Sequence, residues 1–323
     1  MPPFISFIIP YYENHALLGE AIGSIRQYCH NTLHEIIVVD DASPTHTHLN
    51  ALKEECTIIR RSENAGPSAC RNEGIRQAQG TYLSFLDSDD LLIANPTDML
   101  EGSSGEDMVM GRYVDEAHYP LLGRDFPRTS TLRQDPVLIK RIGFWSHLYR
   151  RDFLLGNSIF FPEDMRVAED LVFLARTLGA AKSIWLTKQV NLTYRGDREG
   201  CLSAQGLSDY YIRCVFELLP ERVMDALKDI DDAYAIRFCM LFSRRIEDLK
   251  IILKTHPPET FDWAATQLGA FARHYKNLAN FTDTVKRLNI RWNDRKTSLA
   301  DALSESETTL APAKIRAFIA NPT

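Results

Sequence analysis

Three carboxylates follow directly after an apolar run that has the composition of a buried strand. The stretch "YLSFLDSDDLL" covers residues 82–92 and contains Asp87, Asp89 and Asp90. Two carboxylates at i and i+2 on a turn can point the same way and hold one cation, and oxygen ligands select hard ions such as Mg²⁺ or Mn²⁺. Because Mg²⁺ usually bridges carboxylates and substrate phosphates, a phosphate-bearing ligand is implied. The alternative is an Asx-rich turn that only caps the next element.

The elements that must position these acids alternate regularly along the first hundred residues. Four short apolar runs are typical of strands, at 4–10, 35–41, 57–61 and 81–87. The segments between them favour helices, one beginning after Asn14, one near 45–55, and one running from Pro67 to just before Gly80. This order predicts an α/β fold with a mostly parallel sheet that is covered on both faces.

In open sheets of this kind, ligands bind outside the carboxyl ends of the strands. Pro10, the pair Asp40 and Asp41, and the pair Asp87 and Asp89 all fall at such ends. We therefore expect three strand ends to converge on one crevice, which weakens the interpretation of the acidic cluster as a simple turn.

Composition limits the class of protein. The 323 residues are 45% hydrophobic and 25% charged, as in soluble globular proteins. No apolar run is long enough for a transmembrane helix, and the N-terminus is expected to be a strand, not a signal peptide. The six cysteines are scattered without a CxxC pair, which indicates reduced thiols and a cytoplasmic location. A net charge of −6 argues against nucleic acid as a partner.

The chain changes character near residue 206. Before it, 97–150 is irregular and 168–178 predicts an amphipathic helix; after it, every segment favours a helix. We expect an α/β domain at 1–205 and a helical region at 206–323. Residues 237–296 carry a local charge excess of +6. This excess indicates either a solvated helix face or peripheral attachment to an anionic membrane surface or a polyanionic acceptor.

Six ordered segments carry a resemblance to a known family. They are "FIIPYYEN", "EIIVVDDAS", "NAGPSACRNEGIRQAQGTYLSFLDSDD", "WSHLYRRDFL", "AEDLVF" and "YRGDREGCLS". Together they resemble a family 2 glycosyltransferase over residues 4–205. The resemblance implies the GT-A fold, in which a Rossmann-like, mostly parallel nucleotide-binding sheet is flanked by helices; a helical C-terminal extension would follow it here.

The resemblance also implies a reaction. Such an enzyme would be an inverting, hexosyltransferase-type glycosyltransferase. It would move a sugar from a nucleotide-diphospho-sugar, with a UDP-sugar expected, to a hydroxyl of a glycan or glycolipid acceptor in cell-surface polysaccharide or lipopolysaccharide synthesis. A divalent Mn²⁺ or Mg²⁺ would neutralise the leaving diphosphate. The protein would be cytoplasmic, with peripheral association at the inner face of the membrane through its basic helical region.

Residue roles follow from the resemblance position by position. Asp89, with Asp87, would hold the metal, and Asp40 would support its strand end. Asp90 would cap the following turn. The donor nucleotide would be bound by Pro10, Tyr12, Asp41, Arg71, Asp87, Arg195 and Arg198. The alternative for Arg71 is a solvated helix charge.

The segment "AED" at residues 168–170 would supply the general base. Asp170, with Glu169 beside it, would be the general base, since a carboxylate can take the proton of an attacking sugar hydroxyl. The alternative is a pair of acids favouring a helix N-terminus. Trp145 and His147 would lie on the acceptor side, with packing as the alternative for both. His147 stands where many relatives carry Lys, and Cys201 where they often carry Ser.

Three other functions remain open. A haloacid-dehalogenase-type metal-dependent phosphohydrolase also places DxD after a buried strand, but on its first strand. A sugar nucleotidyltransferase needs a Gly-rich basic loop after the first strand, and "PYYENHALL" offers none. A non-catalytic nucleotide-sugar-binding protein would not need the intact acids at positions 87, 89 and 170.

Overall fold

The computed structural model describes residues 4–114, 126–141, 143–193, 195, 207–273, 281–287, 294–305 and 310–320. The described strands are β1 (Ile5–Tyr11), β2 (His34–Asp40), β3 (Thr57–Arg60), β4 (Tyr82–Phe85), β5 (Leu91–Leu92), β6 (Met108–Tyr113), β7 (Arg128–Ser130), β8 (His147–Arg150) and β9 (Ile184–Thr193). The chain falls into two compact units, Met1–Asp135 with Arg141–Cys201, and Pro136–Lys140 with Leu202–Thr323. The expected boundary at 205/206 stays a prediction; that Pro136–Lys140 joins the second unit was not anticipated.

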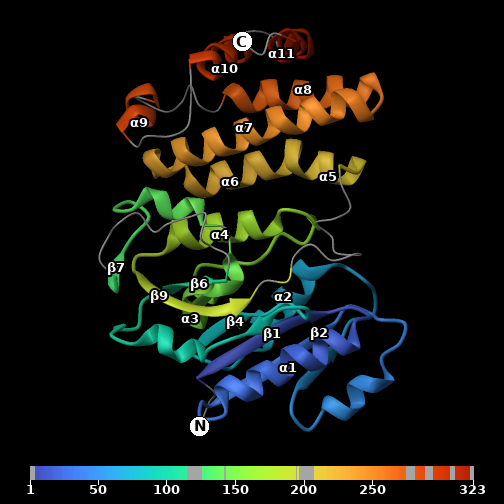
Figure 1. The fold of residues 1–323 in the computed structure, drawn as a ribbon, viewed down its shortest axis with the longest axis vertical. Helices are drawn as coiled ribbons and strands as arrows, with labels where there is room; N and C mark the ends of the chain where they lie inside the picture. The colour runs from blue at the N-terminus through green and yellow to red at the C-terminus, as the bar shows by residue number, and fades with distance from the viewer. Residues whose placement is uncertain are drawn as a thin grey trace. The chain divides into compact units, whose positions relative to one another are not determined.

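Helices and helical turns account for most of the remaining described residues (Figure 1). In the first unit they are α1 (His15–Cys29), η1 (Thr47–Leu52), α2 (Pro67–Gln77), η2 (Pro96–Leu100), η5 (Phe144–Ser146), α3 (Arg151–Gly156) and α4 (Glu169–Ala180). In the second they are η4 (Pro136–Lys140), α5 (Asp209–Arg213), η7 (Cys214–Leu218), α6 (Leu219–Leu227), α7 (Asp231–Thr255), α8 (Pro258–Ala272), α9 (Phe281–Arg287), α10 (Asp294–Glu305) and α11 (Ala311–Ala320).

One mixed sheet forms the centre of the first unit. Its order over the described residues is β3-β2-β1-β4-β8-β6-β9-β5, with β7 paired to β9. The pairs β3-β2, β2-β1 and β1-β4 are parallel, as expected. Beyond β4 the sheet is mixed: β8 runs antiparallel to both β4 and β6, whereas β9 runs parallel to β6 and antiparallel to β5 and β7.

Strand β1 is central and buried along its whole length. It extends one residue past Pro10, where the sequence suggested that it would end. Pro10 pairs with Val39 of β2, whereas β4 accompanies β1 only as far as Ile8. The missing N–H of Pro10 therefore faces the side where the ladder to β4 has already ended, so no sheet hydrogen bond is lost.

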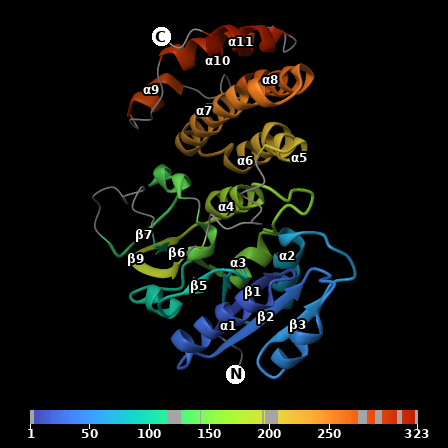
Figure 2. The same cartoon turned by 45° about the vertical axis from the view of Figure 1, so that its right-hand side comes forward.

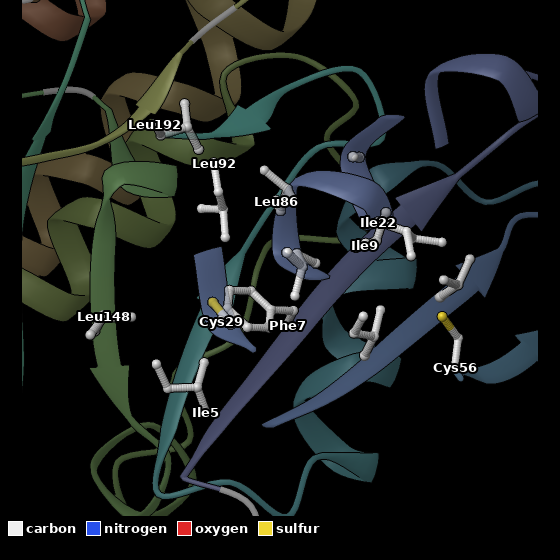
Figure 3. Packing of buried hydrophobic residues seen from close by; sticks show 14 of the residues in the cluster. Ile5, Phe7, Ile9, Ile22, Cys29, Cys56, Leu86, Leu92, Leu148 and Leu192 are labelled. Atoms are coloured by element: carbon white, nitrogen blue, oxygen red, sulfur yellow. The ribbon is translucent and has the colours of Figure 1, made fainter. Parts of the chain in front are cut away.

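The two faces of β1 pack against different helices (Figure 2). Phe7 and Ile9 belong to the core cluster that also contains Ile22 of α1, shown in Figure 3. On the opposite face, a Cβ on Gly74 of α2 would lie 2.3 Å from Cγ2 of Ile8. Only a glycine lets α2 approach so closely. This approach brings the polar residues of α2 to the carboxyl edge of the sheet.

Helix α2 begins at a turn that also requires glycine. Gly66 has φ +91°, a conformation that side chains rarely adopt, and Pro67 occupies the first helical turn. A Cβ at Gly66 would lie 3.2 Å from Cγ of Arg166. The turn is thus shaped for close contact with the segment that precedes α4.

The second unit is helical, as expected after residue 206. Its longest described helix, α7, buries Phe238, Phe242 and Ile252. The expectation of a solvated basic face on this helix is wrong for Arg245, which is 3% exposed and paired with Asp248. In the part of the chain that the structure describes, no helix combines the length and apolar character needed to cross a bilayer.

Candidate active site

Two aspartates end β2 and are engaged differently. Asp40 is fully buried, pairs with Arg60, and accepts the Ser43 N–H at 2.9 Å. It therefore supports the strand end, as expected. Asp41 accepts the backbone N–H groups of Ala65 and Gly66 at 2.9 and 2.7 Å. It holds the turn that starts α2, and its contact with the nucleotide base stays a prediction.

The acidic loop after β4 lies at the same edge of the sheet as Asp41, because β2, β1 and β4 are successive parallel strands. Leu86 N–H donates to Ile8 O at 3.1 Å and Asp90 N–H to Asp87 O at 3.0 Å, so the chain turns immediately after the strand. Asp87 and Asp89 are half-buried, whereas Asp90 is buried. One oxygen of Asp90 accepts the N–H of Arg195 at 2.8 Å. Asp90 thus fixes the loop to the end of β9.

The loop offers chemistry that fits a hard divalent ion. Asp87 and Asp89 supply carboxylate oxygens at i and i+2, and both side chains keep access to solvent. Within the described ranges, no group of three or more His, Cys, Asp or Glu side chains is arranged as a closed metal cage. Beside diphosphates, Mg²⁺ and Mn²⁺ are commonly bound by one or two carboxylates, and water and phosphate oxygens fill the remaining coordination positions.

Arg71 of α2 joins this loop to the second acidic pair. Its Nη2 donates to Oδ1 of Asp87 at 2.7 Å, and its Nη1 donates to Oε1 of Glu169 at 3.0 Å. The residue is 4% exposed, so the alternative of a solvated helix charge is wrong. Burial lowers the pKa of the guanidinium, but Asp87 and Glu169 outweigh it and raise the pKa above its usual value. Its expected contact with the nucleotide stays a prediction.

Aromatic rings form the apolar floor beneath these acids. The guanidinium carbon of Arg71 lies 4.8 Å from the ring centroid of Phe144 and 5.2 Å from that of Phe161. Phe161 and Phe173 stack at 3.9 Å with an interplanar angle of 6°. The rings exclude water and offer cation–π contacts, so the ion pairs of Arg71 act in a medium of low polarity.

Asp170 stands at the N-terminus of α4, next to Glu169. Burial raises the pKa of Asp170 to about 7; repulsion from Glu169 adds to the rise, and the Leu171 N–H and Arg71 oppose it. Glu169 is held by Arg71, whereas the oxygen of Asp170 accepts the Leu171 N–H at 2.8 Å. Ala168, just before α4, has φ +60°, a left-handed conformation that is costly for a non-glycine residue. A conformation of this kind persists only where the surrounding structure over-determines it.

The other predicted donor residues are placed as follows. Pro10 and Tyr12 are at the end of β1, and Tyr12 is 47% exposed. The Nη1 atom of Arg195 donates to Glu20 of α1 at 2.7 Å. Arg198 lies outside the described residues. Their roles toward the donor stay predictions.

The two residues expected on the acceptor side differ in burial. Trp145 is partly buried and packs against the core cluster that contains Phe7 and Ile22. His147 is 1% exposed, and burial followed by the charge of Arg141 holds its pKa well below the usual value. Its imidazole is therefore neutral at physiological pH. Both placements are consistent with the packing alternative, and a role toward an acceptor stays a prediction.

Two polar contacts at the site escaped sequence reasoning. Asn72 donates from Nδ2 to Phe161 O at 2.9 Å and to Glu163 at 2.9 Å, and its Oδ1 accepts the Phe161 N–H at 2.8 Å. The hydroxyl of Tyr11 lies 2.9 Å from Nε2 of His48, a residue to which the sequence assigned no role. The only sequence signal for the first contact is a polar pair, Arg71 and Asn72, inside a helix that packs on a buried sheet.

Comparisons with known proteins agree with this geometry. Residues 6–96 match the sequence profile of the family described as Glycosyl transferase family 2. The chain is 28% identical over 280 residues to the poly(ribitol-phosphate) beta-glucosyltransferase of Bacillus spizizenii, covering 81% of this chain and 41% of the relative. It is 26% identical over 262 residues to the poly(ribitol-phosphate) beta-N-acetylglucosaminyltransferase TarS of Staphylococcus aureus, covering 74% and 44%. The chain thus spans less than half the length of both relatives.

Solved structures show the same fold. The crystal structure of S. aureus TarS 1–349 in complex with UDP superimposes with a TM-score of 0.68 at 18% identity, covering 98% of this chain and 92% of that one. The complex of the same fragment with UDP-GlcNAc gives a TM-score of 0.67 at 19% identity, with the same coverage. The profile match over residues 6–96 and the relatives support a family 2 glycosyltransferase, and the shared architecture shows the GT-A fold.

Proposed function

We propose that the chain is an inverting glycosyltransferase that moves a sugar from a nucleotide-diphospho-sugar to a hydroxyl of a cell-surface glycan. The observation that carries the proposal is the convergence of the Asp87–Asp89 loop and the Glu169–Asp170 pair on one buried cation, Arg71. One acidic pair suits the metal and diphosphate of the donor, and the other suits proton removal from the acceptor. This convergence supports the proposal that donor and acceptor are activated in one site.

Asp170, in preference to Glu169, is proposed as the general base. Glu169 is paired with Arg71, whose Nη1 lies 3.0 Å from its Oε1, so this carboxylate is already engaged by a buried cation. Asp170 has a pKa raised to about 7 by burial and by Glu169. A base whose pKa is close to the working pH transfers protons most effectively, and a positioned carboxylate contributes roughly 10²–10⁴-fold to rate. Attack from the side opposite the diphosphate inverts the anomeric centre.

A divalent ion held by Asp89 and Asp87 would neutralise the negative charge that develops on the leaving diphosphate. The chain's own residues place it: Asp90 ties the loop to the end of β9, and Arg71 orients one oxygen of Asp87. Tyr12 and Pro10, at the end of β1, and Asp41, at the end of β2, are proposed to line the nucleotide side, with Arg195 and Arg198 reaching the diphosphate.

A UDP-sugar is the proposed donor, since the neighbouring TarS structures contain UDP and UDP-GlcNAc. The proposed acceptor is a glycan or polyol-phosphate polymer, on the basis of the relatives' names. Peripheral association with a membrane surface through the helical region remains a prediction from charge alone. The phosphohydrolase alternative is set aside because family and fold are those of glycosyltransferases.

The proposal is tested by binding and transfer measured separately. UDP with Mn²⁺ should raise the melting temperature, and UDP with a chelator should not; Asp89→Asn should abolish the effect. Asp170→Asn should keep the melting-temperature rise and lose at least ~10²-fold in transfer of labelled sugar to poly(ribitol phosphate). Proton NMR of the product should show the β anomer from an α-linked donor. Retained transfer in Asp170→Asn would assign the base elsewhere, and an α product would exclude inversion.

A further inference from the structure

The side chain of Arg71 connects the two acidic pairs directly. Its two terminal nitrogens contact Asp87 at 2.7 Å and Glu169 at 3.0 Å, and these acids come from segments 82 residues apart in the sequence. Asp87 belongs to the proposed metal loop, and Glu169 immediately precedes the proposed base. A change in the charge around one acid therefore alters the electrostatic environment of the other acid through the guanidinium of Arg71.

The guanidinium has little freedom to relax. It is 4% exposed and lies over the rings of Phe144 and Phe161. A planar fork with two fixed hydrogen bonds holds both partners in defined directions, which the single ammonium of a lysine does not. In such water-poor surroundings, breaking one ion pair without compensation is costly, so the two pairs constrain each other.

Other residues of α2 attach the same segment of chain. The hydroxyl of Ser68 donates to Met165 O at 3.4 Å, and Asn72 pairs with the backbone of Phe161. Ser68 and Asn72 thus fasten the segment before α4 to α2, and Arg71 joins α2 to Glu169, the residue next to Asp170. Among these three, Arg71 alone also reaches the acidic loop after β4.

We propose that Arg71 is a positioning residue that couples occupation of the aspartate loop by cation and diphosphate to the placement of the base helix α4. The inference rests on the proposed function of the site. A cation beside Asp87 competes with Arg71 for the carboxylate and drives the guanidinium toward Glu169. By reciprocity, a change at Glu169 alters cation affinity at Asp87, although Glu169 is no ligand of the ion.

A double-mutant cycle tests this coupling without measuring catalysis. Calorimetry gives the dissociation constant of UDP in saturating Mn²⁺, and of Mn²⁺ in the presence of UDP, for wild type, Glu169→Gln, Arg71→Met and the double variant. Glu169→Gln should weaken Mn²⁺ binding by ~5-fold or more in the wild type, and by less than about 2-fold once Arg71 is methionine. Methionine is chosen because it fills the aromatic site without charge.

The matched control is Arg76→Met. Arg76 lies on the same helix, has a 48% exposed side chain, and contacts Glu163 and Phe160 of the same segment, yet touches neither acidic pair. The Glu169→Gln effect should be unchanged in that background. If Arg71→Met does not fold, Arg71→Lys replaces it in the cycle, because lysine retains the charge but lacks the two-nitrogen fork. In that background Glu169→Gln should weaken Mn²⁺ binding by an intermediate factor.

The outcomes separate the coupling from the function. Equal effects of Glu169→Gln with and without Arg71 would overturn the coupling while leaving metal-dependent donor binding, and hence the proposed function, intact. Wild-type protein that does not bind UDP with Mn²⁺ would overturn the proposed function and the coupling with it. In the expected case, Arg71→Met also lowers the single-turnover transfer rate at saturating donor more than it lowers donor affinity, a split that a loss of stability alone would not produce.

Discussion

Asn72 pairs with the backbone of Phe161 in both directions, accepting its N–H at 2.8 Å and donating to its carbonyl at 2.9 Å. The amide reproduces the pairing of a neighbouring strand, so it satisfies two buried backbone groups of the segment that leads to α4. A residue 89 positions away in sequence thus becomes part of the structure around the base.

Replacing this amide should loosen the segment before α4. Asn72→Ala leaves the Phe161 N–H and C=O without their partner, and buried unsatisfied groups cost roughly 1–3 kcal/mol each. We expect a loss of about 2–4 kcal/mol in the free energy of unfolding, measured by urea denaturation. Gln77→Ala is the control, since this amide is on the same helix but exposed. A loss no larger than the control's would show that water replaces the Asn72 contacts.

The close approach of α2 to β1 gives a second prediction, with opposite signs at two helical glycines. A Cβ at Gly74 would meet Ile8 at 2.3 Å, whereas nothing lies within 4 Å of a Cβ at Gly23 of α1. Gly74→Ala should therefore destabilise by about 1–3 kcal/mol through overpacking. Gly23→Ala should stabilise by roughly 0.5–1 kcal/mol, because alanine has the better helix propensity. Stabilisation by Gly74→Ala would mean that α2 can shift away from the sheet.

Local patterns in the sequence were sufficient for the first half of the fold. The short apolar runs ending in Pro10, Asp41 and Asp87 predict parallel strands whose ends converge, and the register of β2, β1 and β4 confirms it. The mixed half of the sheet was not predictable in this way, because β8 inserts between β4 and β6 through contacts distant in sequence. No local periodicity reports such pairing.

The candidate site divides along the same line. Residue types marked Asp87, Asp89 and Asp170 as acids that could do chemistry. The residue that joins Asp87 to Glu169, the neighbour of Asp170, could not be identified from local patterns, since Arg71 resembles any charged residue on a helix until α2 is placed against the sheet. Its burial follows from Gly74, 3 positions later, and from aromatic rings contributed by η5 and the segment before α4.

In the second unit, a buried ion pair gives a third prediction. Asp248 is fully buried and accepts from Nε of Arg245 at 2.8 Å, and Arg245 also donates to Val215 O in η7 at 3.0 Å. Removing the carboxylate by Asp248→Ala leaves a buried cation uncompensated, which costs about 3–5 kcal/mol. The neighbouring Glu247→Ala should cost less than ~0.5 kcal/mol, since its pair with Lys250 is exposed. Similar losses for both would show that solvent reaches Arg245.

The raised pKa of Asp170 predicts how stability depends on pH in the metal-free protein. Its ordinary pKa is 3.8, and burial, with Glu169, raises it to about 7 in the folded chain. The folded state therefore holds this proton more tightly than the unfolded state, so wild type loses stability as the pH rises from about 4 to 7. Asp170→Asn removes the ionisation, and its stability advantage should grow from near zero at pH 4 to about 1–3 kcal/mol at pH 8. Urea denaturation at several pH values measures the difference, and Asp152→Asn, whose side chain is 88% exposed, is the control. If the stability difference between Asp170→Asn and wild type is constant across this pH range, the folded chain leaves the pKa of Asp170 at its ordinary value. Asp170 would then not be suited to act as the base.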